Sequence, residues 1–273
     1  MARGELLMAF GVTEPDAGTD TSRVATRAER VDGRWVINGQ KVWTTNAQHA
    51  SHILLLTRTS PRTEERPLDG LTLFFVPLDR ERCTVREIPK LGRAAIDSNE
   101  VFISNLEATD ADVVGEVGEG FRYLLDGLNP ERIVSAMEAI GMGQAALELA
   151  VRYAKQRVVF DRPIGQNQAI AHPLAKSWAQ LRAAEWTALH AAWLYDSGLP
   201  SGVEATAAKY LAGEAGFAAC DAALQTHGGF GYSKEFHVER LWRECRIFKL
   251  APVSQQMALN FLAQRALGLP KSY

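Results

Sequence analysis

The spacing of the apolar residues changes along this chain, and the change restricts the fold to two parts of different class. Over roughly the first 110 residues the apolar side chains form short runs, such as 52–57 (HILLLT) and 71–76 (LTLFFV), which are typical of strands. Between residues 133 and 158 they recur in alternating steps of four and three, with Gln144 as the one polar member of the series. Such spacing puts them on one face of a long helix that other helices must cover.

The first part is predicted to be a small β-domain. Asp32 and Gly33 lie between two β-prone runs and predict a two-residue hairpin turn. Asn38 and Gly39 predict a second tight turn, and residues 100–103 (EVFI) predict a closing strand. Short strands at this spacing favour an antiparallel barrel or sandwich.

The second part is predicted to be helical. Besides 133–158, helices are expected at about 169–196, 203–226 and 254–267, with ends marked by 197–200 (SGLP) and by the glycines at 228, 229 and 231. Short connections favour an antiparallel helical bundle. The fold class is therefore α+β, with a β-domain over residues 1–112 and a C-terminal bundle over 113–273.

Composition excludes several classes of function. With 30 Lys+Arg against 32 Asp+Glu, there is no basic surplus to attract nucleic acid or an anionic membrane. Three cysteines without a CxxC pair argue against a disulfide framework and favour the cytoplasm. No apolar run approaches the ~20 residues of a membrane span. The six histidines form no HExxH pattern, so we expect no metal site.

A glycine pattern at residues 141–146 (GMGQAA) matches the dinucleotide motif GxGxxA. That motif works only where a strand leads into a helix N-terminus that faces a phosphate. Here the glycines lie inside the long predicted helix, so we expect them to allow close packing between helices.

Two further segments are more specific. Residues 11–20 (GVTEPDAGTD), followed by 43–46 (WTTN), offer hydroxyls and backbone N–H groups to an anion or a carbonyl array. Chemistry alone favours an ordinary polar loop there. Residues 225–232 (QTHGGFGY) precede Glu235, Arg240 and Glu244. Their three glycines permit close approach of the backbone to a ligand without naming it.

Together these segments, with 157–160 (RVVF) and Gln168, closely resemble the acyl-CoA dehydrogenase family of flavoproteins. The family pattern Gly-aliphatic-Thr-Glu-x-x-Ala-Gly-Thr-Asp is matched over 11–20, although Arg23 departs from its last small position. The resemblance covers essentially the whole chain. It implies FAD as cofactor, α,β-dehydrogenation of an acyl-CoA thioester in fatty acid metabolism, a homotetramer or hetero-oligomer, and an electron-transfer flavoprotein as acceptor.

The resemblance also implies cofactor contacts in the β-domain. Val12, through its backbone, and Thr13 should contact the pyrimidine side of the flavin, where donors favour hydride acceptance. Trp43 should pack against the isoalloxazine, and Thr45 should hydrogen-bond near N5. Thr19 should lie near the pyrophosphate.

In the bundle, seven positions match residues that hold FAD. Five of them match residues that hold its adenosine diphosphate part across a subunit interface, and two match cofactor contacts in the last helix. They are Arg157, Phe160, Gln168, Gln225 and Gly229, and then Ser254 and Gln256.

The catalytic base is where this sequence departs from the common family pattern. The position that usually carries the catalytic Glu is Pro252, which has neither a carboxylate nor an N–H group. Some members, isovaleryl-CoA dehydrogenase among them, carry the base on the long helix instead, immediately before an Arg. Residues 128–132 (LNPER) match that place. The resemblance therefore favours Glu131 as the base and Arg132 as a substrate-binding residue, while a simple capping role of Glu131 in a first helical turn is the alternative.

Family members normally carry an N-terminal helical domain of ~120 residues before the first motif, which covers one wall of the acyl pocket. We expect that domain to be lacking here, through truncation or supply by a partner chain. A non-catalytic flavin-binding or assembly subunit is therefore a second hypothesis, which Pro252 also favours.

Overall fold

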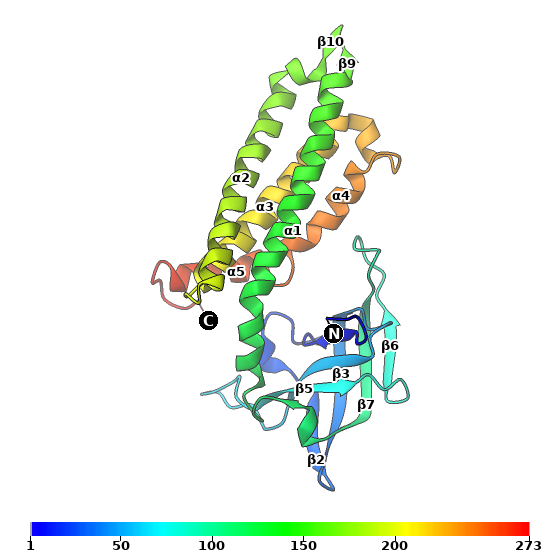
Figure 1. Ribbon diagram of the computed structural model, residues 1–273, viewed down its shortest axis with the longest axis vertical. Helices are drawn as coiled ribbons and strands as arrows, with labels where there is room; N and C mark the ends of the chain where they lie inside the picture. Colours follow the sequence, from blue (N-terminus) through cyan, green and yellow to red (C-terminus); the bar gives the residue numbers. More distant parts are fainter. Residues whose placement is uncertain (1, 273) are drawn as a thin grey trace. The chain divides into compact units, whose positions relative to one another are not determined.

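The computed structural model describes residues 2–272, and contacts within the chain divide them into two compact units. The first unit ends at Gly127 and holds the sheet; the second begins at Leu128 and holds the helices. The class predicted from the sequence, a β part followed by a helical part, is confirmed (Figure 1).

The first unit is built on one eight-stranded sheet in the order β6-β7-β3-β2-β4-β5-β8, with β1 also paired to β4. The pairs of β4 with β1 and with β2 are parallel, whereas the other pairs are antiparallel. The strands are β1 (Met8–Gly11), β2 (Arg27–Val31), β3 (Arg34–Thr45), β4 (His52–Arg58), β5 (Leu71–Pro77), β6 (Cys83–Glu87), β7 (Ser98–Ala108) and β8 (Val113–Val114).

The barrel expected from the strand spacing is not closed. Among the described residues, β6 and β8 stand at the two ends of the strand order and do not pair with one another. Closure requires the end strands to meet along a ladder with a fixed stagger, and β8 offers only two residues for such a ladder. The wholly antiparallel arrangement is also wrong, because β1 and β2 run parallel to β4.

The two turn predictions had different outcomes. Asp32 and Gly33 have φ values of 49° and 80° and connect β2 to β3 as a two-residue turn, as predicted. The turn predicted at Asn38 and Gly39 is wrong, because both lie inside β3, where its register against β7 shifts. Gly39 has a φ of 154°, and a Cβ there would lie 2.7 Å from the Thr26 Cα. The glycine thus permits a bulge and close packing, not a chain reversal.

The second unit contains the helices α2 (Gln168–Asp196), α3 (Gly202–His227), α4 (Val238–Cys245) and α5 (Gln255–Arg265), together with most of α1 (Gly120–Gln156). The predicted limits of α2, α3 and α5 are confirmed to within a few residues. The long helix begins at Gly120 instead of 133, and Pro130 lies inside it. The eight-residue α4 is too short to show a helical period in the sequence.

The helical core is made largely of small side chains. Along α3, buried alanines recur at 205, 208, 212, 215, 219 and 223, and they face the buried residues of α1 and α2. A Cβ on Gly143 of α1 would lie 2.9 Å from the Gly216 Cα of α3 and 2.8 Å from Leu181 Cδ2 of α2. The packing role predicted for Gly143 is confirmed, whereas Gly141 faces open space and packs against nothing.

Two general observations concern the described residues as a whole. None of the helices within residues 2–272 combines the length and the apolar character needed to cross a membrane. The thiols of Cys83, Cys220 and Cys245 are all free and buried.

Candidate functional site

In the first unit, the segment that follows β1 is fixed from several directions. The Val42 N–H donates to the Thr13 carbonyl over 2.9 Å, so this segment lies against β3. The Lys41 ammonium donates to the Val12 carbonyl over 3.0 Å and to Glu14 Oε1 over 2.8 Å. Within residues 2–272, the N–H groups of Val12 and Thr13 have no acceptor. They are two free donors on a fixed backbone.

A bulge in β3 sets the direction of Trp43. Lys41 pairs with Val101 and Thr44 with Asn99, so β3 carries one residue more than β7 over this stretch. Trp43 is 57% exposed and has a φ of 59°, which any bulky residue adopts only under constraint. The indole therefore projects from β3, the strand to which the Thr13 carbonyl is hydrogen-bonded.

The structure thus brings four of the five predicted cofactor residues of this unit onto two adjoining segments. Thr45 is exposed at the end of β3, next to Thr44, whose buried hydroxyl has no partner among the described residues. Thr19 is exposed in the turn before the short 3₁₀ helix Thr21–Arg23, and no contact places it with the other four.

In the second unit, three predicted cofactor residues line one pocket of about 610 Å³: Arg157, Gln225 and Gly229. Arg157 follows α1 directly, while Gln225 and Gly229 lie at the junction of α3 and the 3₁₀ helix Gly228–Tyr232. The His227 ring in this wall stacks on Tyr153 at 4.3 Å between centroids, and its Nδ1 lies 2.8 Å from the Ala223 carbonyl. The pocket combines a guanidinium with a glycine-rich backbone.

Four other predicted residues of this unit lie outside that pocket. Phe160 is 93% exposed at the tip of the hairpin between β9 (Val158–Val159) and β10 (Arg162–Pro163). Gln168 is exposed at the start of α2, and Gln256 is exposed near the start of α5. The Ser254 hydroxyl accepts a hydrogen bond from the Met257 N–H over 3.3 Å and so caps α5.

Glu131 and Arg132 lie well inside α1. A capping role of Glu131 in a first helical turn is therefore wrong, because the helix begins at Gly120. Although Glu131 is exposed at the protein surface, the residues packed around it desolvate its carboxyl and raise its pKa above the ordinary value, and the charge of Arg132 offsets this only in part. Arg132 donates from Nη1 to Asn129 Oδ1 over 2.9 Å, while its buried Nε has no partner within residues 2–272. An uncommitted donor therefore lies beside a carboxyl whose proton affinity is increased.

The segment around Pro252 is held by residues that sequence reasoning missed. Lys209 is buried in α3 and donates to the Val253 carbonyl and, over 3.0 Å, to Gln255 Oε1. Burial lowers the pKa of Lys209 to about 8, and repulsion from Arg132 acts in the same direction. Gln255, not Gln256, is the buried amide of this segment.

Lys41 and Glu14 were also missed as members of the first unit's site. A lysine inside an otherwise β-prone run was the available signal, because a cation there needs a buried partner. The described residues contain no group of three or more His, Cys, Asp or Glu side chains that could hold an ion.

Comparison with known proteins relates both units of the chain to one protein family. Residues 9–106 match the sequence model of the acyl-CoA dehydrogenase middle domain, and residues 118–267 match that of the acyl-CoA dehydrogenase C-terminal domain. The chain belongs to the acyl-CoA dehydrogenase family. It is 39% identical over 277 aligned residues to the acyl-CoA dehydrogenase fadE12 of Mycobacterium bovis, covering 100% of this chain and 70% of that protein.

Solved structures of the acyl-CoA dehydrogenase family agree with the fold. An acyl-CoA dehydrogenase from Geobacillus kaustophilus matches with a TM-score of 0.93 and 29% identity, over 97% of this chain and 70% of the other. Butyryl-CoA dehydrogenase from Megasphaera elsdenii matches with a TM-score of 0.91 and 31% identity, over 97% and 68%.

FAD is the cofactor of the family, and the residues present fit it. The unused N–H groups of Val12 and Thr13 suit the carbonyl and nitrogen acceptors of a flavin, and the projecting Trp43 offers a flat apolar surface. The guanidinium of Arg157, in the pocket that Gln225 and Gly229 also line, suits the oxygens of a pyrophosphate.

Proposed function

We propose that the chain catalyses α,β-dehydrogenation of an acyl-CoA thioester, with Glu131 as the base that removes the α-proton. The place of Glu131 on α1, next to Arg132 with its unpartnered buried Nε, carries this assignment. The raised pKa of Glu131 agrees with it, because a base must hold the proton it takes from carbon. As the α C–H bond breaks, its proton goes to the Glu131 carboxylate and its electron pair forms the new C=C bond. FAD, when bound, supplies the acceptor at N5 for the β-hydrogen and its electron pair.

The other residues bind and orient. We expect the free Nε of Arg132 to hold substrate near Glu131, because a buried donor without a partner gains most from a bound acceptor. We expect the Val12 backbone N–H and Thr13 to contact the pyrimidine side of the flavin. Trp43 should pack on the isoalloxazine, and Thr45 should hydrogen-bond near N5. Thr19 should lie near the pyrophosphate. The remaining predicted FAD contacts are Arg157, Phe160, Gln168, Gln225, Gly229, Ser254 and Gln256.

Replacement of Glu131 tests the assignment. Glu131→Gln is expected to retain bound flavin and to abolish its anaerobic bleaching by a panel of acyl-CoAs, because the amide cannot accept the α-proton. Glu148→Gln is the matched control, since Glu148 is exposed on the same helix. Near-normal bleaching by the Glu131 variant rejects Glu131 as the base.

A second candidate is a non-catalytic flavin-binding or assembly subunit, which Pro252 favours because the usual position of the base lacks a carboxylate. Yellow wild-type protein that no acyl-CoA bleaches is the result that supports this candidate. A protein without flavin absorbance contradicts both candidates.

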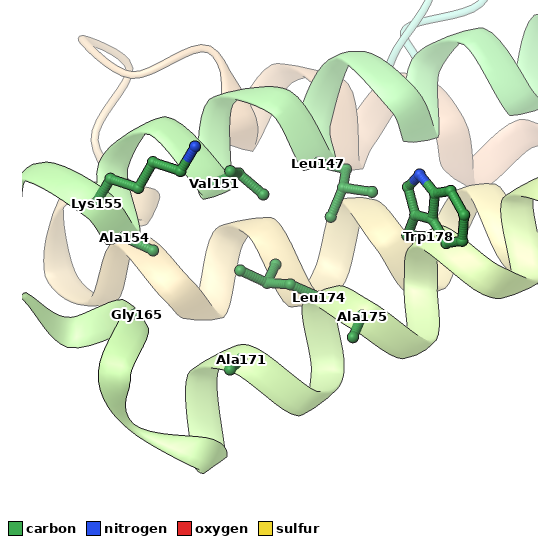
Figure 2. Close-up of a pocket in the computed structure, with 9 residues that line it drawn as sticks. All are labelled: Leu147, Val151, Ala154, Lys155, Gly165, Ala171, Leu174, Ala175 and Trp178. Atoms are coloured by element: carbon green, nitrogen blue, oxygen red, sulfur yellow. The ribbon is translucent and has the colours of Figure 1, made fainter.

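Self-association finds support on α2. Trp178, Trp186, Leu189 and Trp193 are all exposed and fall on one face of that helix. An apolar groove of about 330 Å³ between α1 and α2 ends at Trp178 (Figure 2). Family members oligomerise, and exposed apolar faces often mark protein–protein contacts. We propose that further copies of this chain cover it in a homotetramer.

The remaining partners follow from the family. We propose an electron-transfer flavoprotein as the electron acceptor, fatty acid metabolism as the setting, and the cytoplasm as the location, which agrees with three free thiols.

A further inference from the structure

A buried ion pair lies next to Val12 and Thr13, the residues proposed above to contact the flavin. Lys41 is fully buried, and Glu14 is 6% exposed. The two Glu14 oxygens accept hydrogen bonds from the backbone N–H groups of Thr26, over 2.9 Å, and Ala25, over 2.7 Å. Glu14 is therefore fixed to the backbone of Ala25 and Thr26, and Lys41 is fixed to Glu14.

Each member of this pair stabilises the charged form of the other. Burial lowers the pKa of Lys41 to about 8, against the attraction of Glu14. Burial alone would raise the pKa of Glu14, but Lys41 and the hydrogen bonds outweigh it and bring that pKa below its ordinary value. The geometry is that of an ion pair, with the Lys41 ammonium 2.8 Å from Glu14 Oε1.

A buried ion pair is weak evidence for a gain in stability. Replacing a buried ion pair by apolar side chains of similar volume is often neutral or stabilising. The stem packs closely: a Cβ on Gly11 would lie 3.4 Å from Lys41 Cγ, an ordinary van der Waals distance, and 3.0 Å from side-chain atoms of Ile53 and Leu55. The contacts of the ammonium itself therefore point to a role for Lys41.

The ammonium touches the Val12 carbonyl. In a planar trans peptide group, the carbonyl and the following N–H point in opposite directions. The Thr13 N–H therefore points away from Lys41, and it has no acceptor within residues 2–272. A cation on the carbonyl polarises the peptide group and strengthens its N–H as a donor.

We propose that Lys41, braced by Glu14, is a positioning residue that fixes the peptide group between Val12 and Thr13 and strengthens its N–H toward the pyrimidine ring of FAD. This inference rests on the flavin function proposed above. Lys41 reaches the flavin only through that peptide group.

Two substitutions separate charge from hydrogen bonding. Lys41→Met removes both, whereas Lys41→Gln keeps a neutral donor and serves where the Met variant does not fold. Arg34→Met is the matched control, because Arg34 lies on the same strand in an exposed pair with Glu107. The FAD dissociation constant is expected to rise about tenfold for Lys41→Met and less for Lys41→Gln. The midpoint potential of bound FAD is expected to become more negative in both.

Hydrogen exchange in the protein without FAD supplies an independent readout. The peptide covering residues 9–17 is expected to exchange faster in Lys41→Met than in the wild type and in Arg34→Met. Folded variants with wild-type FAD affinity and potential overturn the inference. If wild-type protein binds no FAD, the proposed function fails. In that case the positioning of residues 12–13 by Lys41 is still tested by hydrogen exchange, and unchanged exchange over residues 9–17 in Lys41→Met overturns it.

Discussion

Close packing of α1 against α3 gives a prediction with an internal control. Gly141 and Gly143 lie two residues apart on α1, yet a Cβ on Gly143 would lie 2.9 Å from the Gly216 Cα, whereas a Cβ on Gly141 meets nothing within 4 Å. Gly143→Ala must therefore push the two helices apart, because a backbone atom cannot rotate away. Overpacking of this kind typically costs about 1–3 kcal/mol.

The same substitution at Gly141 should have the opposite sign. Alanine is better than glycine inside a helix by about 1 kcal/mol, and nothing opposes that gain here. Gly216→Ala should be the most costly, since its Cβ would approach the Ala139 carbonyl oxygen far inside contact distance.

Thermal or urea unfolding followed by circular dichroism measures the series. At about 2–4 °C per kcal/mol for a chain of this size class, Gly143→Ala should lower Tm by several degrees and Gly141→Ala should raise it slightly. Equal changes in Tm for Gly141→Ala and Gly143→Ala would refute the packing argument.

Three further predictions concern charge and assembly. Arg132→Gln removes the attraction that partly offsets the raised pKa of Glu131, so the acid limb of kcat/KM should move to higher pH; an unmoved limb contradicts the pairing. The lowered pKa of Glu14 stabilises the fold above its ordinary value of 4.5, and this contribution is lost as pH falls through the folded pKa. The difference in unfolding free energy between wild type and Glu14→Gln should therefore shrink in acid, and a constant difference counts against it. Trp186→Glu charges the exposed face of α2 and should reduce the mass in sedimentation equilibrium, whereas an unchanged mass excludes that face from assembly.

The sequence predicted those elements that depend only on residues adjacent in the chain. The hairpin at Asp32 and Gly33 follows from two residues that tolerate positive φ between β-prone runs. Asn38 and Gly39 carry the same chemistry, but there β3 continues past a bulge because β7 and β2 pair on either side of it. Nothing in the neighbouring sequence distinguishes the two cases, since the pairing partners are distant in the chain.

The site shows a similar division. Motifs drew attention to Thr13, Trp43 and Arg157, and the structure gives each a surrounding that suits a cofactor. The residues behind them escaped notice. Lys209 looks in the sequence like an ordinary exposed cation, and the one sequence signal at Lys41 is its place in a β-prone run. The fold shows that both are buried against carbonyl oxygens.

The small side chains of the helical core make the two units respond to mutation in opposite ways. In the sheet, the core holds large residues such as Trp35, Ile53 and Phe74, so random change mostly removes volume and leaves cavities. Along α3, where alanine recurs at the buried positions, nearly every substitution adds volume. Truncating replacements should therefore dominate the deleterious class in the first unit, and enlarging ones in the second. A saturation library would record that asymmetry as two distinct patterns of tolerated residue size on one polypeptide.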